Sequence, residues 1–285
     1  MNKNLSNLPD PAGMARMDLF PGPIAGSDGR VDSQGRRTFR LLWRALWFAG
    51  ELLLFAGHFI VLVMRHGGMP PQLARSRWLQ WCSRRALRIL SVDYESRGAC
   101  PQSGLLVCNH LSYLDILVLV ALLPAVFVSK SEVRHWPVFG WFAILSGTLF
   151  VDRTRRRDVP RMNARIERTL AGGNVVVLFP EGTSWNGKEI LPFKSSLLEP
   201  IVGSGQPLSV GHIAYSLDDG TVEKDVCYWG DMTFFPHLVN LMQKRHVLAR
   251  VSFSAIAQPA PDRKALAQQL HTEVTRLAVY TDCHK

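Results

Sequence analysis

The sequence predicts an α/β fold, a layered domain in which a mostly buried mixed sheet is flanked by helices. Short apolar runs typical of buried strands alternate with stretches of helical periodicity from residue 104 onward. The chain has 285 residues, which is enough for one large core, and 47% of them are hydrophobic, so it is not a disordered protein. An apolar helical segment precedes the expected domain.

The individual elements follow from these patterns. The expected strands are apolar runs at 104–108, 125–129, 147–151, 174–179, 206–215 and 246–257. Helical periodicity lies near 113–123, 137–146, 158–171, 194–203 and 262–280. Strands buried on both faces read as continuous apolar runs, so the sheet is expected to lie between layers of helices.

The chain divides into three parts by composition. Residues 1–37 are rich in Gly, Pro, Asp and Ser without apolar periodicity, and we expect a mobile tail there. Residues 38–84 are expected to form a membrane-associating helical segment, and residues 85–285 the folded domain.

The apolar run at 45–64 is the main indication of a membrane. Twenty helical residues span about 30 Å, the thickness of a hydrocarbon core. Arginines precede the run, whereas Glu51 within it opposes insertion by roughly 2 to 3 kcal/mol. The pattern therefore leaves open whether this helix spans the membrane or lies in its interface, and a buried soluble helix is a third reading. The basic amphipathic stretch 73–91 suits an anionic lipid surface or a helix packed on the domain with solvated arginines.

Charge and cysteine content restrict the partners. The net charge is +10, from 33 Lys and Arg against 23 Asp and Glu, which favours nucleic acid, an anionic membrane or an acidic substrate. The five cysteines are scattered, without a C-x-x-C pair or zinc-like spacing. We read them as reduced thiols of a cytosolic compartment and predict no metal site.

The first motif with chemical content is the stretch Cys108 to Asp115, at a strand-to-helix corner. His110 lies on the turn and Asp115 in the first turn of the next helix. An aspartate that accepts the proton on one imidazole nitrogen fixes the tautomer and leaves the other nitrogen free as a base. The alternative is structural, because Ser112 and Asp115 also form an S-x-x-D capping box.

Two further motifs follow strand ends. At the end of 147–151 come Asp152 and Arg153, and arginine suits bidentate phosphate contacts. The arginines further along read as the solvated face of a helix. After 174–179 comes Pro-Glu-Gly-Thr-Ser, whose backbone N–H groups can face an anion or an ester oxygen, with Lys194 downstream. A plain turn with a surface glutamate and lysine is the alternative.

Together the three motifs resemble the glycerolipid acyltransferase family, which makes phosphatidate from lysophosphatidate, over roughly residues 85–260. The resemblance implies a layered glycerolipid-acyltransferase-like domain in residues 85–285. It implies that His110 is the general base on the acceptor hydroxyl and that Asp115 orients it. The residues it assigns to the acceptor head group are Arg153, Glu181, Gly182 and Thr183, with Lys194 assisting.

The implied reaction moves a fatty acyl group from acyl-CoA or acyl carrier protein to the free hydroxyl of 1-acylglycerol-3-phosphate. The donor is a co-substrate, and no other cofactor is implied. The partners are then a lysolipid acceptor, the acyl donor and a membrane lipid surface, but not nucleic acid. The expected location is the cytoplasmic face of the inner (plasma) membrane.

The sequence departs from the family pattern in ways that concern the acceptor. Many phosphatidate-forming members carry arginine after Glu-Gly-Thr, where this chain has Ser184, and Val210 replaces a second proline near Pro207. The sequence around Ser184 looks like a bacterial branch that includes lyso-ornithine lipid acyltransferases, so a lyso-ornithine lipid is the alternative acceptor. Asp231, between aromatic residues, either reaches the site or lies in a turn of an aromatic-rich core segment.

Other classes of function fit less well. A metal-dependent phosphohydrolase needs more clustered His and Asp ligands than the sequence offers. A nucleic-acid-binding module lacks a recognisable motif, and the apolar run 45–64 favours lipid. A lipid-binding relative without catalytic activity is a further alternative, and turnover that disappears in His110→Ala would exclude it.

Overall fold

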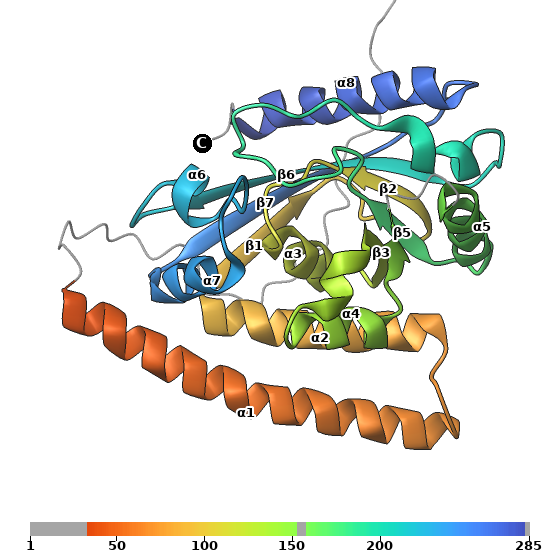
Figure 1. The fold of residues 1–285 in the computed structure, drawn as a ribbon. Coiled ribbons are helices and arrows are strands. Elements are labelled where there is room, and N and C mark those ends of the chain that lie inside the picture. The colour runs from red at the N-terminus through yellow and green to blue at the C-terminus, as the bar shows by residue number, and fades with distance from the viewer. Residues whose placement is uncertain (1–32, 153–157, 283–285) are drawn as a thin grey trace, which may run out of the picture. The chain divides into compact units, whose positions relative to one another are not determined.

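The computed structural model describes residues 33–152 and 158–282. Its centre is a seven-stranded sheet with the order β1-β7-β6-β2-β5-β3-β4 (Figure 1). Neighbouring strands are parallel except β6 and β7, which are antiparallel, so the sheet is mixed, as predicted. The strands are β1 (Val92–Arg97), β2 (Gly104–Cys108), β3 (Ala125–Lys130), β4 (Leu149–Val151), β5 (Val175–Leu178), β6 (Leu208–Leu217) and β7 (Val247–Ala255).

Helices cover the sheet and extend beyond it. They are α1 (Gln34–His66), α2 (Gln72–Leu90), α3 (Leu114–Leu122), α4 (Phe139–Ser146), α5 (Asp158–Ala171), α6 (Val222–Asp225), α7 (Phe234–Gln243) and α8 (Arg263–Asp282). Short 3₁₀ turns lie at η1 (Ser131–His135), η2 (Ser195–Leu197) and η3 (Glu199–Ile201).

The alternation of side chains along the strands separates two apolar cores. Leu105 and Val107 of β2 pack with residues of α5 and α8 on one face of the sheet. Leu106 and Cys108 point to the other face, where α2 and α3 lie. Figure 1 shows α8 on one side of the sheet and α2, α3 and α4 on the other. Because both faces are covered, the strands read as continuous apolar runs in the sequence.

The central strands bring the candidate site together. β2 ends at Cys108, which pairs with Gly211 of β6, and β6 then continues beyond the end of β2. A Cβ atom on Gly211 would lie 2.4 Å from Sγ of Cys108, so the Cys108 side chain occupies the space that a side chain at position 211 would need. Beyond this point the side chain of Asn109 donates to the carbonyl of Ile213 at 3.0 Å and accepts from its N–H at 2.8 Å. The turn after β2 is therefore fixed to the extension of β6.

Most of the predicted elements are confirmed, and the exceptions have physical causes. The helix expected at 194–203 is wrong: the structure has only η2 and η3 there, because Pro200 cannot donate the N–H bond that a continuous helix needs. Strand β1 was not predicted, since its sequence VDYESR is mostly polar and only Val92 is buried. Helix α7 was likewise not predicted, because it begins within the aromatic-rich segment 227–238.

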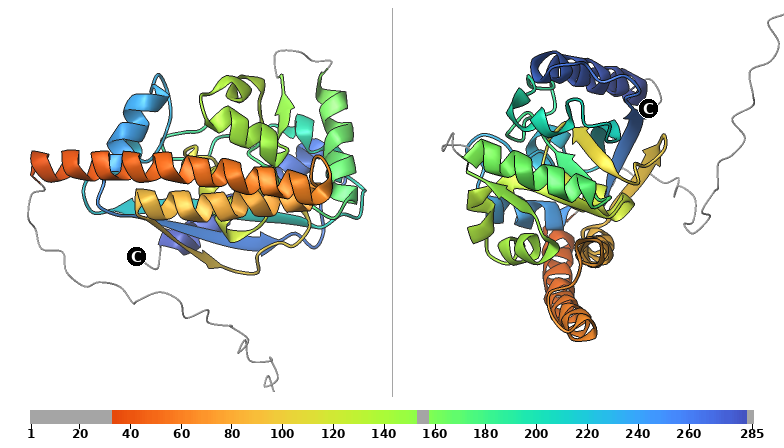
Figure 2. Two further views of the ribbon diagram at one scale, coloured as in Figure 1. Left: turned by 90° about the horizontal axis from the view of Figure 1, so that it is seen from below. Right: turned by 90° about the vertical axis from the view of Figure 1, so that its right-hand side faces the viewer.

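Helix α1 is a long helix with a central apolar stretch and lies on the outside of α2 (Figures 1 and 2). Among the residues that the structure describes, it is the one helix long and apolar enough to cross a membrane. Only 17% of its most apolar 18-residue stretch is buried inside the protein. Phe55 and Phe59 face the domain, against Trp78 and Trp81 of α2. Other large apolar side chains of α1 are exposed, among them Phe39, Leu42, Trp43, Leu46, Leu53, Ile60 and Met64.

Two charged residues attach α1 to the rest of the chain. Arg44 is 5% exposed and donates to the carbonyls of Met242 at 2.9 Å and Lys244 at 2.6 Å, at the end of α7. Glu51 is also buried and forms a bidentate ion pair with Arg85 of α2 at 2.5 and 2.6 Å. Both residues lie in the same buried stripe as Phe55, so the helix is held along much of its length.

The division of the chain at residues 37 and 84 stays a prediction. Residues 1–32 lie outside the described part. The expected boundary at residue 84 falls inside α2, which packs on both α1 and α3.

Substituting Arg44 with alanine should destabilise the protein, because the carbonyls at the end of α7 would lose a buried charged donor. We expect Arg44→Ala to lower the free energy of unfolding by roughly 2 to 4 kcal/mol. Thermal unfolding in detergent measures the loss, with Arg36→Ala on the exposed first turn of α1 as the matched control. Equal transition temperatures for the two variants would contradict this role.

Candidate active site

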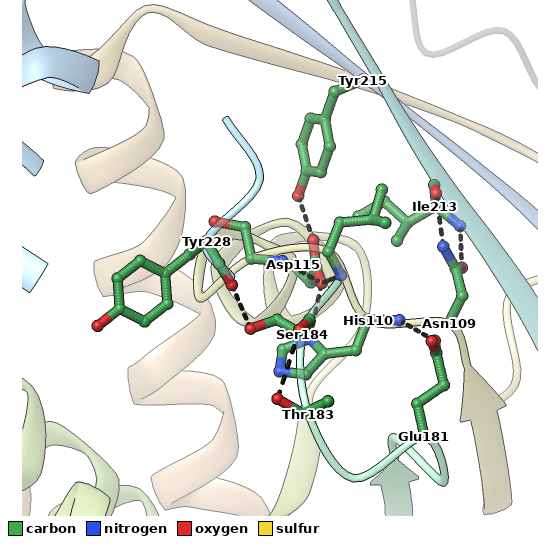
Figure 3. Close-up of polar contacts among 11 residues, drawn as sticks. Asn109, His110, Asp115, Glu181, Thr183, Ser184, Ile213, Tyr215 and Tyr228 are labelled. Atoms are coloured by element: carbon green, nitrogen blue, oxygen red, sulfur yellow. Dashed lines mark hydrogen bonds and ion pairs between the residues drawn. The ribbon is translucent and has the colours of Figure 1, made fainter. Parts of the chain in front are cut away.

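The site is built around the turn between β2 and α3. Nδ1 of His110 lies 2.8 Å from Oδ2 of Asp115, so the structure brings the predicted pair together (Figure 3). A carboxylate accepts hydrogen bonds, so Nδ1 carries the proton and Nε2 keeps its lone pair. The imidazole is 19% exposed whereas the Asp115 side chain is completely buried. The arrangement thus presents a histidine whose ring is oriented from behind by a buried carboxylate.

Asp115 also organises the backbone of the turn. Its Oδ2 accepts from the N–H groups of Leu111 at 2.7 Å and Ser112 at 3.0 Å. Of the two bonds of the capping box considered above, the structure has the one from the Ser112 N–H to Asp115 but lacks its reciprocal, because the Ser112 hydroxyl is buried without a hydrogen-bond partner among the described residues. Oδ1 accepts from the Tyr215 hydroxyl at 2.7 Å. Asp115 therefore stabilises the turn and orients the histidine at once.

The face of the imidazole is also fixed. Phe179, directly after β5, stacks on His110 with ring centroids 4.1 Å apart and an angle of 11° between the planes. The carbonyl of His110 accepts from the N–H of Trp185 at 3.0 Å. The third motif thus contacts His110 through both its aromatic residue and its loop.

Glu181 lies beneath this loop and is 3% exposed. Its carboxylate oxygens accept from the N–H groups of His110 at 2.7 Å and Leu191 at 3.0 Å. Burial raises the pKa of Glu181 to about 7, and the two backbone hydrogen bonds oppose this shift. In this geometry Glu181 joins the two loops of the site and directs both carboxylate oxygens at the main chain.

The other residues predicted to bind the head group are placed differently. Gly182 adopts a φ of 80°, which only glycine takes readily, and so turns the chain after Glu181. Thr183 is exposed at the surface of the site. Lys194 is exposed and lines a cavity of about 230 Å³ that Phe179 also lines. Arg153 lies outside the described residues.

Ser184 connects the third motif to the aromatic-rich segment. Its hydroxyl donates to the carbonyl of Tyr228, whose N–H donates to the carbonyl of Leu111 at 2.8 Å (Figure 3). Residue 184 is therefore used for loop-to-loop contact. Asp231, three residues beyond Tyr228, is exposed.

An apolar cavity of about 60 Å³ lies between the helices on the α1 side of the sheet. Tyr113, three residues from His110, lines it together with Leu117, Phe142 and residues of α1, α2 and α7. The Tyr113 hydroxyl bonds to Nδ1 of His237 at 2.9 Å. Nε2 of His237 faces the carbonyl of Cys227 at 3.1 Å and must carry the proton, so Tyr113 is the donor.

Sequence reasoning placed Phe179 at the start of the third motif without giving it a role, and it did not identify Tyr215 as part of the site. Phe179 had a local signal, since it directly precedes Pro-Glu-Gly-Thr-Ser at a strand end. Tyr215 had none, because an aromatic residue in an apolar strand reads as core and Asp115 lies 100 positions away.

The fold is that of an α/β domain in which the carboxylate-oriented His110 lies at the edge of a mostly parallel sheet. The family model described as Acyltransferase matches residues 92–209. A lyso-ornithine lipid O-acyltransferase of Pseudomonas aeruginosa is 32% identical over 85% of this chain and 94% of its own length. A second, from Brucella abortus, is 35% identical over 67% of this chain and 75% of its own length.

A 1-acyl-sn-glycerol-3-phosphate acyltransferase of Neisseria meningitidis is 30% identical over 73% of this chain and 82% of its own length. The crystal structure of the lysophosphatidate acyltransferase PlsC from Thermotoga maritima has the same fold, with a TM-score of 0.57. The match between the two structures covers 85% of this chain and 96% of the Thermotoga chain, at 17% sequence identity. The chain therefore belongs to the acyltransferase family, and it is an O-acyltransferase.

The raised pKa of Glu181 should make stability depend on pH. A carboxyl group that binds its proton more tightly in the folded state loses stability as pH rises from about 4.5, its ordinary value, through about 7. Relative to Glu181→Gln, which does not titrate, the wild type should therefore lose roughly 2 to 3 kcal/mol across this window.

Thermal unfolding of both proteins at the two ends of this window tests the prediction. Glu189→Gln, at an exposed position of the same loop, is the control and should follow the wild type. A constant difference between wild type and Glu181→Gln across the window would show that the pKa of Glu181 is the same in the folded and unfolded protein and would contradict the prediction.

Proposed function

We propose that this protein transfers a fatty acyl group from an acyl thioester to the free hydroxyl of a lysolipid, with His110 as general base. The observation that carries this proposal is the 2.8 Å hydrogen bond between Nδ1 of His110 and Asp115, which leaves Nε2 free to accept a proton. A base so placed is worth about 10² to 10⁴ in rate.

The reaction needs no covalent acyl-enzyme. Nε2 of His110 removes the hydroxyl proton as the oxygen attacks the thioester carbonyl, and Asp115 stabilises the imidazolium that forms. The tetrahedral intermediate then collapses, the carbon–sulfur bond breaks, and the proton passes from His110 to the departing thiolate. The products are the ester and a free thiol. The donor is acyl-CoA or acyl carrier protein, and the net charge of +10 suits either acidic molecule.

The surroundings of His110 suit a lipid substrate on two sides. The cavity beside Phe179 carries the cation of Lys194 and has room for a head group. The apolar cavity beside Tyr113 is lined by residues of α1 and α2 among others and suits an acyl chain. We assign the polar end of the acceptor to the first cavity and apolar chains to the second.

The acceptor that we favour is a lyso-ornithine lipid. The position where many phosphatidate-forming acyltransferases carry arginine is Ser184, and its hydroxyl is used by the carbonyl of Tyr228. Relatives named as lyso-ornithine lipid O-acyltransferases, at 32% and 35% identity, support the same choice.

The second candidate acceptor is 1-acylglycerol-3-phosphate, which would give phosphatidate. The exposed ammonium of Lys194 at the cavity suits a phosphate, and relatives of that name from Neisseria are 30% identical. The two candidates differ in the charge of the head group rather than in the chemistry at His110.

Thiol release by the detergent-purified protein tests both the reaction and the acceptor. With palmitoyl-CoA or palmitoyl carrier protein as donor, we expect release with lyso-ornithine lipid to exceed release with lysophosphatidate by about tenfold or more, since phosphate would lack one charged ligand. His110→Ala should reduce the rate by about 10² to 10⁴.

His246→Ala is the matched control. His246 directly precedes β7 and pairs with Asp93 of β1 instead of Asp115. Higher turnover with lysophosphatidate would reverse the choice of acceptor. The acyltransferase mechanism fails if His110→Ala keeps the wild-type rate.

We also propose that the protein is bound to the cytoplasmic face of the inner membrane with α1 lying in the plane of the interface. Arg44 and Glu51 bind groups of the folded domain, and a spanning helix would have to leave those partners. The exposed apolar side chains of α1 suit the boundary between head groups and acyl chains. This position favours an interfacial helix over a spanning one.

Charged substitutions on the exposed face of α1 should release the protein from vesicles. Trp43 and Leu46 are 57% and 70% exposed, and Trp43→Asp with Leu46→Asp should weaken binding to anionic liposomes by about tenfold or more. Flotation measures the effect. Val279→Asp on α8, at a side chain 61% exposed, is the matched control on the other side of the sheet. Resistance of the wild type to alkaline carbonate extraction would indicate a spanning helix instead.

A further inference from the structure

The completely buried carboxylate of Asp115 needs hydrogen-bond donors on both of its oxygens. Oδ2 receives three: Nδ1 of His110 and the N–H groups of Leu111 and Ser112. Oδ1 lies on the other side and receives the hydroxyl of Tyr215 at 2.7 Å (Figure 3). A carboxylate that is left without a partner in such a place is strongly destabilised.

The distribution of donors also decides which way the carboxylate faces. The terminal torsion of aspartate is broad, so bonds to one oxygen alone restrict its rotation only weakly. A bond to Oδ1 from a different element holds the second oxygen and thereby the plane of the group. That plane determines whether Oδ2 stays in line with Nδ1 of His110.

Tyr215 is suited to this task by its position. It is 6% exposed and lies on the face of β6 that packs against α3. Its place is set by the pairing of β6 with β2 and by the two bonds between Asn109 and Ile213, two residues earlier. Burial and the neighbouring Asp115 raise the pKa of Tyr215 well above its usual value, so the hydroxyl stays a donor.

We propose that Tyr215 is a positioning residue of the active site, whose hydroxyl holds Asp115 so that the proton stays on Nδ1 of His110. The proposal rests on the proposed function only for its effect on rate. Its effect on the His–Asp pair belongs to the protein itself and is measurable without substrate.

The variant that tests it is Tyr215→Phe, which keeps the ring and removes the hydroxyl. We expect kcat to fall by about 10- to 100-fold, the range covered by one hydrogen bond to a charged group, with little change in KM. Without this donor the pair binds a proton more tightly, so the acid limb of the pH–rate profile should move to higher pH. The other titratable groups near Asp115 are Cys108, Cys227 and Glu181, which are unchanged in the variant.

Tyr94→Phe is the matched control, because it removes the hydroxyl of a half-buried tyrosine on the edge strand β1, which β7 separates from β6. It should leave the acid limb where the wild type has it. An unshifted acid limb in Tyr215→Phe, with a rate loss no larger than that of Tyr94→Phe, would mean that Tyr215 is only structural and would overturn the proposal. Circular dichroism and thermal unfolding establish that both variants fold.

Nitrogen NMR of histidine-labelled protein separates this inference from the proposed function. The wild type should show His110 protonated at Nδ1, and Tyr215→Phe should show a changed tautomer or protonation midpoint, whether or not thiol is released. The same His110 signal in both proteins would overturn the role of Tyr215 even in an active enzyme. A changed signal in a protein without acyltransferase activity would support it and refute the proposed function.

Discussion

The burial of the Asp115 carboxylate is the constraint on which the rest of the site depends. A charge without solvent must be matched by donors, and these come from the turn, from His110 and from β6. The turn can supply them only because Asn109 joins it to Ile213 after the regular pairing of β2 has ended. The geometry of the His110–Asp115 pair therefore depends on the register between β2 and β6.

Local parts of this arrangement were readable in the sequence, and non-local parts were not. His110 and Asp115 lie five positions apart across a strand end, so their contact followed from one predicted corner. Tyr215 reaches Asp115 through the pairing of distant strands, and no residue pattern encodes that register. The sheet itself was predictable because buried strands are apolar throughout, whereas the polar edge strand β1 gave no such signal.

The contacts of the charged residues in α1 could likewise not be predicted from the sequence. In the sequence Arg44 belongs to a basic flank and Glu51 is a cost to membrane insertion. In the structure each has a partner in the folded domain, the carbonyls at the end of α7 for one and Arg85 for the other. Composition reports how apolar a helix is, but the depth at which it lies depends on which of its charges the protein neutralises.

The attachment of α1 through Arg44 bears on attempts to make this enzyme soluble. The carbonyls of Met242 and Lys244 belong to the end of α7, so Arg44 also serves as the cap of that helix. Helix α7 in turn carries His237, which bonds to Tyr113, three residues from His110. A chain shortened to remove the apolar helix would thus lose part of the support around the candidate site, and replacing the exposed residues while keeping Arg44 is the sounder design.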